Sequence, residues 1–294
     1  MFIVALEGGL GNQMFEYAFY LAIKEIYPKE DIKADLSFIS SKMHNGYELE
    51  KIFGINPPTC TKYDIIRYSD YYPGHKRGGR TINFFLRVRR KLFGRKASCL
   101  LQPDATEFIE EYFKLDKGKD YYFKGVWANE LYFRNIKKEI RKAFTFPPID
   151  DNENSKWYKL IRESNSVGVH FRGGDYYKTG YSVLDKDYYD KAFEYIEQNL
   201  EDVTYFVFTD DERHACEIFG KDSRRYYFIK NNQGKMSYID MQLMSICRHN
   251  IIANSTFSFW GAYLNNNAEK IVIAPKRPVR GCKFPYQSKG WVLL

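Results

Sequence analysis

The chain has 294 residues, of which 44% are hydrophobic, 18% aromatic and 28% charged, and its formal net charge is +8. This length suffices for a sizeable core and most naturally for two domains. The basic balance favours an acidic ligand or an anionic surface, without distinguishing between them. No apolar run approaches the roughly 20 residues of a membrane-spanning helix, and no signal segment is apparent. We therefore expect a cytoplasmic protein that can associate with the inner face of the membrane.

The five cysteines are scattered along the chain without a C-x-x-C pair. The count is odd, and several of them lie in apolar runs. Both features favour buried, reduced thiols over a disulfide framework.

The N-terminal residues predict a strand at 2–6, followed by a glycine-rich turn and a helix, with the sequence GGLGNQMFEYA at 8–18. Such a turn brings backbone N–H groups to the carboxyl edge of a sheet, where open α/β folds bind ligands. The dinucleotide pattern G-x-G-x-x-G is excluded, because its third glycine would fall on Met14. The amides of Asn12 and Gln13 donate and accept hydrogen bonds, which suits a polyhydroxy ligand.

The rest of the first half is less regular, with strands expected near 32–34 and 121–126. Residues 75–96 contain many Lys and Arg and no acid. Such a basic amphipathic helix lies on a membrane surface or contacts an anionic acceptor. The alternative, which we favour, is a helix packed on its own domain with a solvated basic face. The apolar side of the expected helix comprises Ile82, Phe85, Leu86, Leu92 and Phe93, with Arg87, Arg90 and Lys91 largely on other sides.

From residue 166 onward, short apolar strands alternate with helices. This pattern predicts a parallel, doubly wound sheet. Residues 146–152 are proline-rich and then acidic, which predicts a boundary between an α/β domain at 1–150 and a second at 151–294. The expected strands are 167–171, 203–209, 226–229, 250–253 and 270–274, and the expected helices are 187–199, 212–219, 237–247 and 257–265.

Polar side chains follow two of these strands. His170, Arg172 and Asp175 lie at or just past the end of the strand at 167–171, and an arginine suits a diphosphate because its planar fork makes bidentate bonds. An Arg–Asp ion pair that closes a loop is the alternative. Asn254, Ser255, Thr256 and Ser258 crowd the start of a later helix, where N–H groups and hydroxyls form an anion site or, alternatively, an ordinary cap.

Asp240 lies on the apolar face of the expected helix at 237–247. A carboxylate there costs free energy unless it meets donors. A guanine offers two adjacent donors, N1–H and the N2 amino group, to one carboxylate. The alternative is a buried aspartate paired with Arg248 or His249.

Together, these segments resemble the α-1,2-fucosyltransferases, a family of bacteria and animals that uses GDP-fucose. The resemblance rests on GGLGNQMFEYA at 8–18, HFRGGDYY at 170–177, FVFTDD at 206–211 and NSTFSFWGAYL at 254–264. It implies a GT-B-type α/β fold, in which two facing Rossmann-like domains enclose a cleft. The domain at 1–150, with a basic helical insertion about 75–96, would face the acceptor, and the domain at 151–294 would bind the nucleotide sugar.

The resemblance also implies roles for single residues. His170 and Arg172 would contact the nucleotide and diphosphate, Asp240 the guanine, and Asn12 the donor sugar or the acceptor. Arg172, Asn12 and Asp175 are the catalytic candidates. The sequence does not identify a base; Asp175 and Glu7 are candidates for it on their position alone, and the family pattern does not support Glu7. One departure is Gly173, which stands where the family pattern H-x-R-R-G-D has a second arginine. The phosphate-binding turn would comprise Ser255, Thr256 and Ser258.

The expected reaction is an inverting transfer of fucose from GDP-β-L-fucose to the 2-hydroxyl of a terminal galactose on a glycan, without a cofactor. We expect no metal, because the D-x-D at Asp185 and Asp187 directly precedes a helix and is better explained as a cap. The first alternative is a glycosyltransferase with another nucleotide sugar. The second is a nucleic-acid binder that uses residues 75–96, which the absence of an RNP, KH or helix-turn-helix pattern disfavours.

Overall fold

The computed structural model describes residues 1–40, 44–173, 184–219 and 226–294. The chain divides into two compact units, Met1–Thr145 and Phe146–Leu294. The division falls at the start of the proline-rich segment 146–152. Each unit contains one sheet, and every strand pair recorded in either sheet is parallel.

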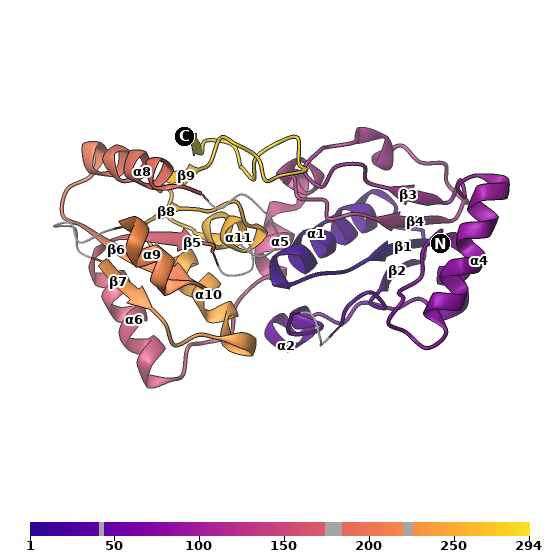
Figure 1. Ribbon diagram of the computed structural model, residues 1–294, viewed down its shortest axis with the longest axis horizontal. Helices are drawn as coiled ribbons and strands as arrows, with labels where there is room; N and C mark the ends of the chain where they lie inside the picture. The colour runs from indigo at the N-terminus through magenta and orange to yellow at the C-terminus, as the bar shows by residue number, and fades with distance from the viewer. Residues whose placement is uncertain (41–43, 174–183, 220–225) are drawn as a thin grey trace. The chain divides into compact units, whose positions relative to one another are not determined.

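The first unit has a four-stranded sheet of order β2-β1-β4-β3. Helix α1 (Leu10–Ile26) covers one face, and α3 (Lys62–Tyr68) and α4 (Gly79–Phe93) pack on the other (Figure 1). The strands are β1 (Phe2–Ala5), β2 (Ile32–Asp35), β3 (Cys99–Leu101) and β4 (Tyr121–Lys124), and the shorter helices are α2 (Glu48–Phe53) and α5 (Lys137–Ala143).

Aromatic rings fill the core beneath α1. Phe19 stacks on Trp127 with ring centroids 4.1 Å apart, and Phe123 and Tyr132 meet Phe19 edge-on at 5.3 Å each. Edge-to-face and offset-stacked pairs of this kind stabilise a core beyond the area they bury. Much of the high aromatic content is therefore structural rather than ligand-binding.

The second unit has a six-stranded sheet of order β10-β9-β8-β5-β6-β7. Numbered within the unit, this is the order 3-2-1-4-5-6 of the Rossmann fold, in which the chain reverses direction across the sheet between β5 and β8. The strands are β5 (Asn165–Phe171), β6 (Val203–Thr209), β7 (Tyr226–Ile229), β8 (His249–Ile251), β9 (Val272–Ala274) and β10 (Val292–Leu293), and the helices are α6 (Asn152–Glu163), α8 (Lys186–Asn199), α9 (Glu212–Phe219), α10 (Tyr238–Ile246) and α11 (Thr256–Leu264).

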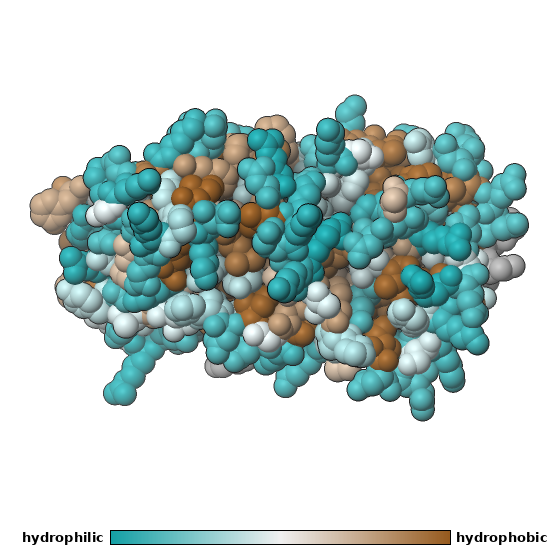
Figure 2. Space-filling model, turned by 180° about the vertical axis from the view of Figure 1, so that it is seen from behind, coloured by the Kyte–Doolittle hydropathy of each residue, from teal (hydrophilic) through white to brown (hydrophobic). Residues whose placement is uncertain are grey.

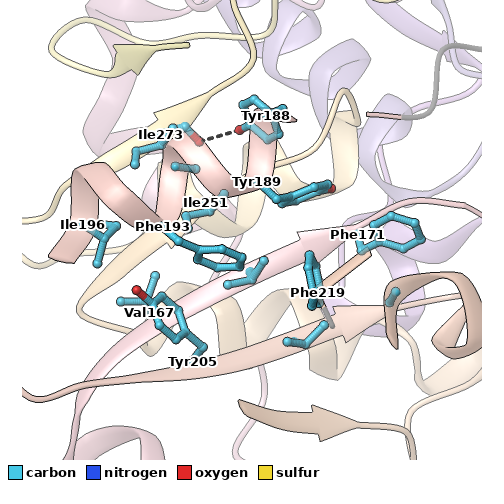
Figure 3. Packing of buried hydrophobic residues seen from close by; sticks show 14 residues of the cluster. Val167, Phe171, Tyr188, Tyr189, Phe193, Ile196, Tyr205, Phe219, Ile251 and Ile273 are labelled. Atoms are coloured by element: carbon cyan, nitrogen blue, oxygen red, sulfur yellow. Dashed lines mark hydrogen bonds between the residues drawn. The ribbon is translucent and has the colours of Figure 1, made fainter. Parts of the chain in front are cut away.

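Alternation along β5 sends Val167, Val169 and Phe171 toward α8 and α9, where they meet Phe193 and Phe219 (Figure 3). The opposite face of the sheet packs against α6 and α10. Because both faces are covered, the strands are apolar along their length, as the sequence pattern predicted.

Several elements were not predicted, namely the 12-residue helix α6 and the shorter α2, α3, α5, β3 and β10. None of the five cysteines forms a disulfide; Cys99 and Cys247 are buried, but Cys216 is exposed, contrary to the expectation of burial. Within the described part of the chain, no helix is both long and apolar enough to cross a bilayer.

Candidate active site

The reversal of strand order in the second unit places polar residues at one edge of the sheet. The register pairs Phe171 with Thr209 and Val169 with Ile251, so the segments that follow β5, β6 and β8 emerge at the same carboxyl edge. Open α/β sheets bind ligands at such a switch point. The predicted residues His170 and Arg172 lie at the end of β5, and the predicted turn at Ser255 follows β8.

Arg172 is held by an acidic residue that the sequence did not single out. Its Nη1 lies 2.9 Å from Oδ2 of Asp210, at the end of β6, and the other oxygen of Asp210 accepts a hydrogen bond from the backbone N–H of Gly173 at 3.1 Å. Both side chains are about one-third exposed. The ion pair therefore orients the guanidinium at the edge of the sheet while leaving it accessible to a ligand.

His170 lies beneath this edge and is 4% exposed. Burial, and next the positive charge of Arg172, lower the pKa of His170 to about 3, so its imidazole is neutral at physiological pH. Its ring packs against Phe257 at the start of α11, and Nδ1 has no hydrogen-bond partner among the described residues. A buried polar atom without a partner costs free energy, which a bound ligand that reaches it would recover.

The start of α11 is capped by its own hydroxyls. Ser255 Oγ accepts from the N–H of Phe257 at 3.2 Å, and Ser258 Oγ donates to the carbonyl of Ala253 at 3.1 Å. Ser258 is fully buried, whereas Thr256 is half-buried. Thr256, together with the positive end of the helix dipole, is thus the best placed of the three predicted residues to meet an anion.

Asp240 lies in the first turn of α10 and pairs with neither Arg248 nor His249, the partners of the alternative interpretation. Its Oδ1 accepts from the amide of Asn232 at 2.7 Å, and Asn154 holds Asn232 through amide hydrogen bonds of 2.8 and 2.9 Å. Burial raises the pKa of Asp240 to about 7, against the lowering effect of the Asn232 hydrogen bond. The carboxyl group is therefore poised between its neutral and ionised forms near physiological pH.

In the first unit, the glycine-rich segment is mostly helix rather than turn. Asn12 and Gln13 belong to the first turn of α1, which begins at Leu10. Gly8 has φ of 79°, and a Cβ there would lie 2.8 Å from the side-chain nitrogen of Asn12. Glycine is required at this position both by the backbone conformation and by the close approach of the Asn12 amide.

Gln13 is fully buried and does not face a ligand, contrary to the sequence interpretation. Its amide nitrogen donates to the carbonyls of Gly8 and Gly46, each at 2.9 Å, and its oxygen accepts from the N–H of Glu48. Gln13 therefore ties the start of α1 to the loop before α2 and has a structural role.

Two acids lie beside this turn. The Glu16 side chain is fully buried and accepts from the N–H of Glu7 at 2.8 Å, and burial raises its pKa well above the usual range. Glu7, a candidate base, forms an ion pair with Lys124 at the end of β4. The pair joins the segment after β1 to the end of β4, its neighbour in the first sheet.

Asp175 lies outside the described residues. Asp185 caps α8 by accepting from the N–H of Tyr188 at 3.1 Å, and Asp187 pairs with Lys191 one turn along the helix, so the D-x-D has the capping role that we predicted.

A cavity of about 750 Å³ also opens in the second unit, lined by Asn165 and His249 at the amino ends of β5 and β8. It lies at the sheet edge opposite the candidate site.

Asp210, Asn232 and Asn154 are the residues that sequence reasoning missed. For Asp210, a signal was present, since it directly follows the strand at 203–209 and belongs to the motif FVFTDD. For Asn154 and Asn232, no local pattern was available, because the two residues are 78 positions apart and meet only in the fold.

The fold, with its parallel α/β sheets, is of the GT-B type. Among solved structures, an α-1,6-fucosyltransferase, NodZ, soaked with GDP-fucose has this fold, with a TM-score of 0.50, 15% identity and coverage of 90% of this chain and 91% of that one. The same enzyme co-crystallised with GDP also has a TM-score of 0.50. Because the sequence identity is only 15%, this structural similarity is evidence for the fold alone.

Sequence comparison identifies the family. Residues 105–289 match the family described as glycosyl transferase family 11. An α-1,2-colitosyltransferase of Escherichia coli is 31% identical over 93% of this chain and 90% of its own length, and the O-antigen biosynthesis glycosyltransferase WbnK of the same species is 31% identical over 98% and 99%. A mouse galactoside 2-α-L-fucosyltransferase is 24% identical over 90% of this chain and 64% of its own length. The chain belongs to glycosyltransferase family 11, and the resemblance to the α-1,2-fucosyltransferases is confirmed.

Proposed function

We propose that this glycosyltransferase moves L-fucose from GDP-β-L-fucose to the 2-hydroxyl of a terminal galactose, with inversion at the anomeric carbon. The family and the names of its relatives support the reaction class. The observation that carries the donor assignment is the group of residues at the carboxyl edge of the second sheet, where Arg172, His170 and the start of α11 surround the switch point. The acceptor is a glycan, for which the first unit provides the contacts.

Guanine recognition falls to Asp240. An ionised carboxylate accepts both the N1–H and the N2 amino group of guanine, whereas uracil presents a single N–H flanked by carbonyls. The hydrogen bond from Asn232 fixes the carboxyl group before the ligand arrives. Because donors stabilise the charged form, guanine binding lowers the pKa of Asp240 from about 7.

The diphosphate is assigned to Arg172 and to the N-terminal turn of α11, with Ser255 and Thr256 as its polar side chains and Ser258 bracing the turn from within. His170 is neutral, and its buried Nδ1 offers a hydrogen bond rather than a charge. Asp210 keeps the guanidinium in place, so Arg172 meets the diphosphate with little reorganisation.

The transition state is oxocarbenium-like, and negative charge grows on the β-phosphate as the sugar leaves. Arg172 and the helix N-terminus stabilise this charge, which allows the reaction to proceed without a metal. Asn12 is assigned to the sugar, and Asp175 and Glu7 are the candidate bases that accept the proton of the acceptor hydroxyl.

A second candidate is transfer of colitose, which the α-1,2-colitosyltransferase relative favours. Colitose is fucose without the 3-hydroxyl group. A site that binds this hydroxyl discriminates strongly against the deoxy sugar, whereas a site that leaves it in solvent accepts both donors. Transfer rates with GDP-fucose and GDP-colitose separate the two candidates.

Substitution of Arg172 tests the assignment of the leaving group. One preorganised donor of this kind contributes about 3–4 kcal/mol to transition-state stabilisation, so Arg172→Ala should lower kcat by a factor of about 10² to 10³. Arg172→Lys should recover only part of this loss, because a lysine cannot make the bidentate contact. Measured release of GDP during transfer checks both; near-normal turnover by the two variants would remove Arg172 from this role.

A further inference from the structure

Helix α4 exposes an apolar stripe on the side that faces away from its own unit. Phe84, Val88 and Leu92 are spaced four residues apart, so they line one stripe about 12 Å long, with Phe85 beside it. Phe84, Phe85 and Leu92 are 60%, 64% and 71% exposed. Large side chains in such a row on a soluble surface mark a contact site rather than an ordinary solvated face.

A different side of α4 anchors it to the first unit. Leu86 is buried and Ile82 partly buried in the cluster that also contains residues of β1, α3 and β4. The side chain of Asn83 accepts from the N–H of Tyr72 at 3.0 Å, and Arg89 pairs with Asp70 at 3.3 Å. The inner stripe and its polar contacts hold the helix, so the outer stripe is not needed for docking on the unit.

Basic residues flank the outer stripe. Arg80, Arg87 and Lys91 lie 7 and 4 residues apart, which places them in a neighbouring row along the same exposed half of the helix. No acidic partner is recorded for these three within the described residues. Figure 2 shows apolar atoms projecting beside hydrophilic ones at its left margin, where α4 lies in that view. The residues before and after α4 extend the basic character, and residues 75–96 contain no acid.

We propose that the outer stripe of α4 docks on an anionic lipid bilayer, with Phe84, Phe85, Val88 and Leu92 at the boundary of the acyl chains and Arg80, Arg87 and Lys91 among the headgroups. An amphipathic helix with aromatic and basic residues of this kind lies flat in the membrane interface. Juxtaposed basic side chains are attracted to anionic headgroups. A second copy of the chain is a less suitable partner for the outer stripe. A symmetric contact between two α4 helices would bring their rows of Arg and Lys together, and like charges repel.

The proposal also revises the interpretation of this helix that we favoured from the sequence. That interpretation placed Phe85, Leu92 and Phe93 with Ile82 and Leu86 on the buried side, and left a solvated basic face. The structure buries only Gly79 and Leu86 fully. The exposed face of α4 therefore carries both apolar and basic side chains. A helix whose outer face only meets solvent has no need of the exposed apolar side chains.

Binding to vesicles tests the proposal with the full chain. Co-sedimentation with vesicles of phosphatidylcholine and phosphatidylglycerol in equal parts should exceed that with pure phosphatidylcholine and should fall as salt is raised. Phe84→Ser/Leu92→Ser and Arg87→Glu/Lys91→Glu should each weaken the partition coefficient by about tenfold or more. The matched controls Leu131→Ser/Tyr158→Ser and Lys138→Glu/Lys156→Glu change exposed residues outside α4 and should leave binding near that of the unmodified chain.

Fluorescence distinguishes insertion from simple adsorption. None of the four tryptophans lies in α4, so Phe85→Trp adds a reporter whose emission should shift to the blue when anionic vesicles are added. Thermal unfolding checks that each variant folds. Absence of binding to anionic vesicles, an unshifted emission, or α4 variants that bind like their controls would overturn the proposal. So would a dimer in solution that Phe84→Ser/Leu92→Ser abolishes while vesicles remain unbound.

Discussion

Burial raises the pKa of the Asp240 carboxyl group to about 7. In the proposed complex, this group must be ionised to accept the hydrogen bonds of guanine. Below pH 7, the proton must leave before the base binds, so affinity for GDP-fucose should weaken by up to about tenfold for each pH unit below the pKa. Calorimetric titration with GDP-fucose between pH 5.5 and about 8.5 checks this, because the diphosphate of the sugar nucleotide does not titrate in this range.

The matched variant for this experiment is Asp240→Asn, which keeps the shape and cannot be ionised. Its affinity should be lower at pH 8 and should show no slope with pH. A flat profile for the unmodified chain, or an unchanged slope in the variant, would contradict the role of Asp240. The same raised pKa has an opposite consequence for folding: the contribution of Asp240 to stability is largest below pH 3.8 and is lost as pH rises toward 7.

Gly173 stands where the family pattern has a second arginine, and the structure indicates a physical reason for glycine. A Cβ at this position would lie 2.8 Å from Cε1 of Phe171 and 3.0 Å from Cβ of Asp211. Gly173→Ala should therefore lower the free energy of unfolding by about 1–3 kcal/mol, and Gly173→Arg should not raise turnover.

Denaturant unfolding measures this cost. Gly74→Ala is the matched control, since a Cβ there meets nothing within 4 Å, and its effect should stay within about 0.5 kcal/mol. If Gly173→Ala were as stable as the unmodified chain, crowding would not explain the glycine.

At the scale of the element, Asp185 is the N-cap residue directly before helix α8, and its side chain accepts a hydrogen bond from the N–H of Tyr188. Asp185→Ala should lower the free energy of unfolding by about 0.5–2 kcal/mol, and transfer activity in excess chelator should be unchanged in both proteins. Thermal unfolding and an activity assay with EDTA check these outcomes. A different result would assign the D-x-D to a metal site. In that case the unmodified chain would lose its activity in chelator and regain it with Mg²⁺ or Mn²⁺, whereas the variant would not regain it.

Most elements of the second unit could be predicted, because continuous apolar strands and capped helices leave a clear pattern; the strand at 203–209 and the helix at 212–219 were predicted with their observed bounds. Strands β3 and β10 were missed, since segments of three and two residues are too short to show a period. Helix α4 was predicted, and Ile82 and Leu86 of its expected apolar side do pack on the unit, but Phe85, Leu92 and Phe93 are exposed. Its apolar residues form two stripes, and periodicity alone does not tell which of them packs.

At the scale of the whole molecule, the parallel sheet of the second unit followed from the alternation of strands and helices, and the Rossmann-like first unit from the family resemblance. The order of the strands followed from neither. The polar residues at the strand ends were visible in the sequence, and the switch point between β5 and β8 explains why His170, Arg172 and Ser255 share one sheet edge. The contacts from Asp210 to Arg172 and from Asn232 to Asp240 join residues from separate strands and helices. Only the folded chain reveals which partners hold these groups.

We propose that this family 11 glycosyltransferase transfers fucose from GDP-fucose to the 2-hydroxyl of galactose. The most direct measurement is incubation of the purified chain with GDP-fucose and a β-galactoside, followed by NMR of the product. The expected product is an α-1,2-linked fucosyl galactoside, which Arg172→Ala should form more slowly. No transfer from GDP-fucose alongside efficient transfer from another nucleotide sugar, or a product linked at another hydroxyl, would contradict it.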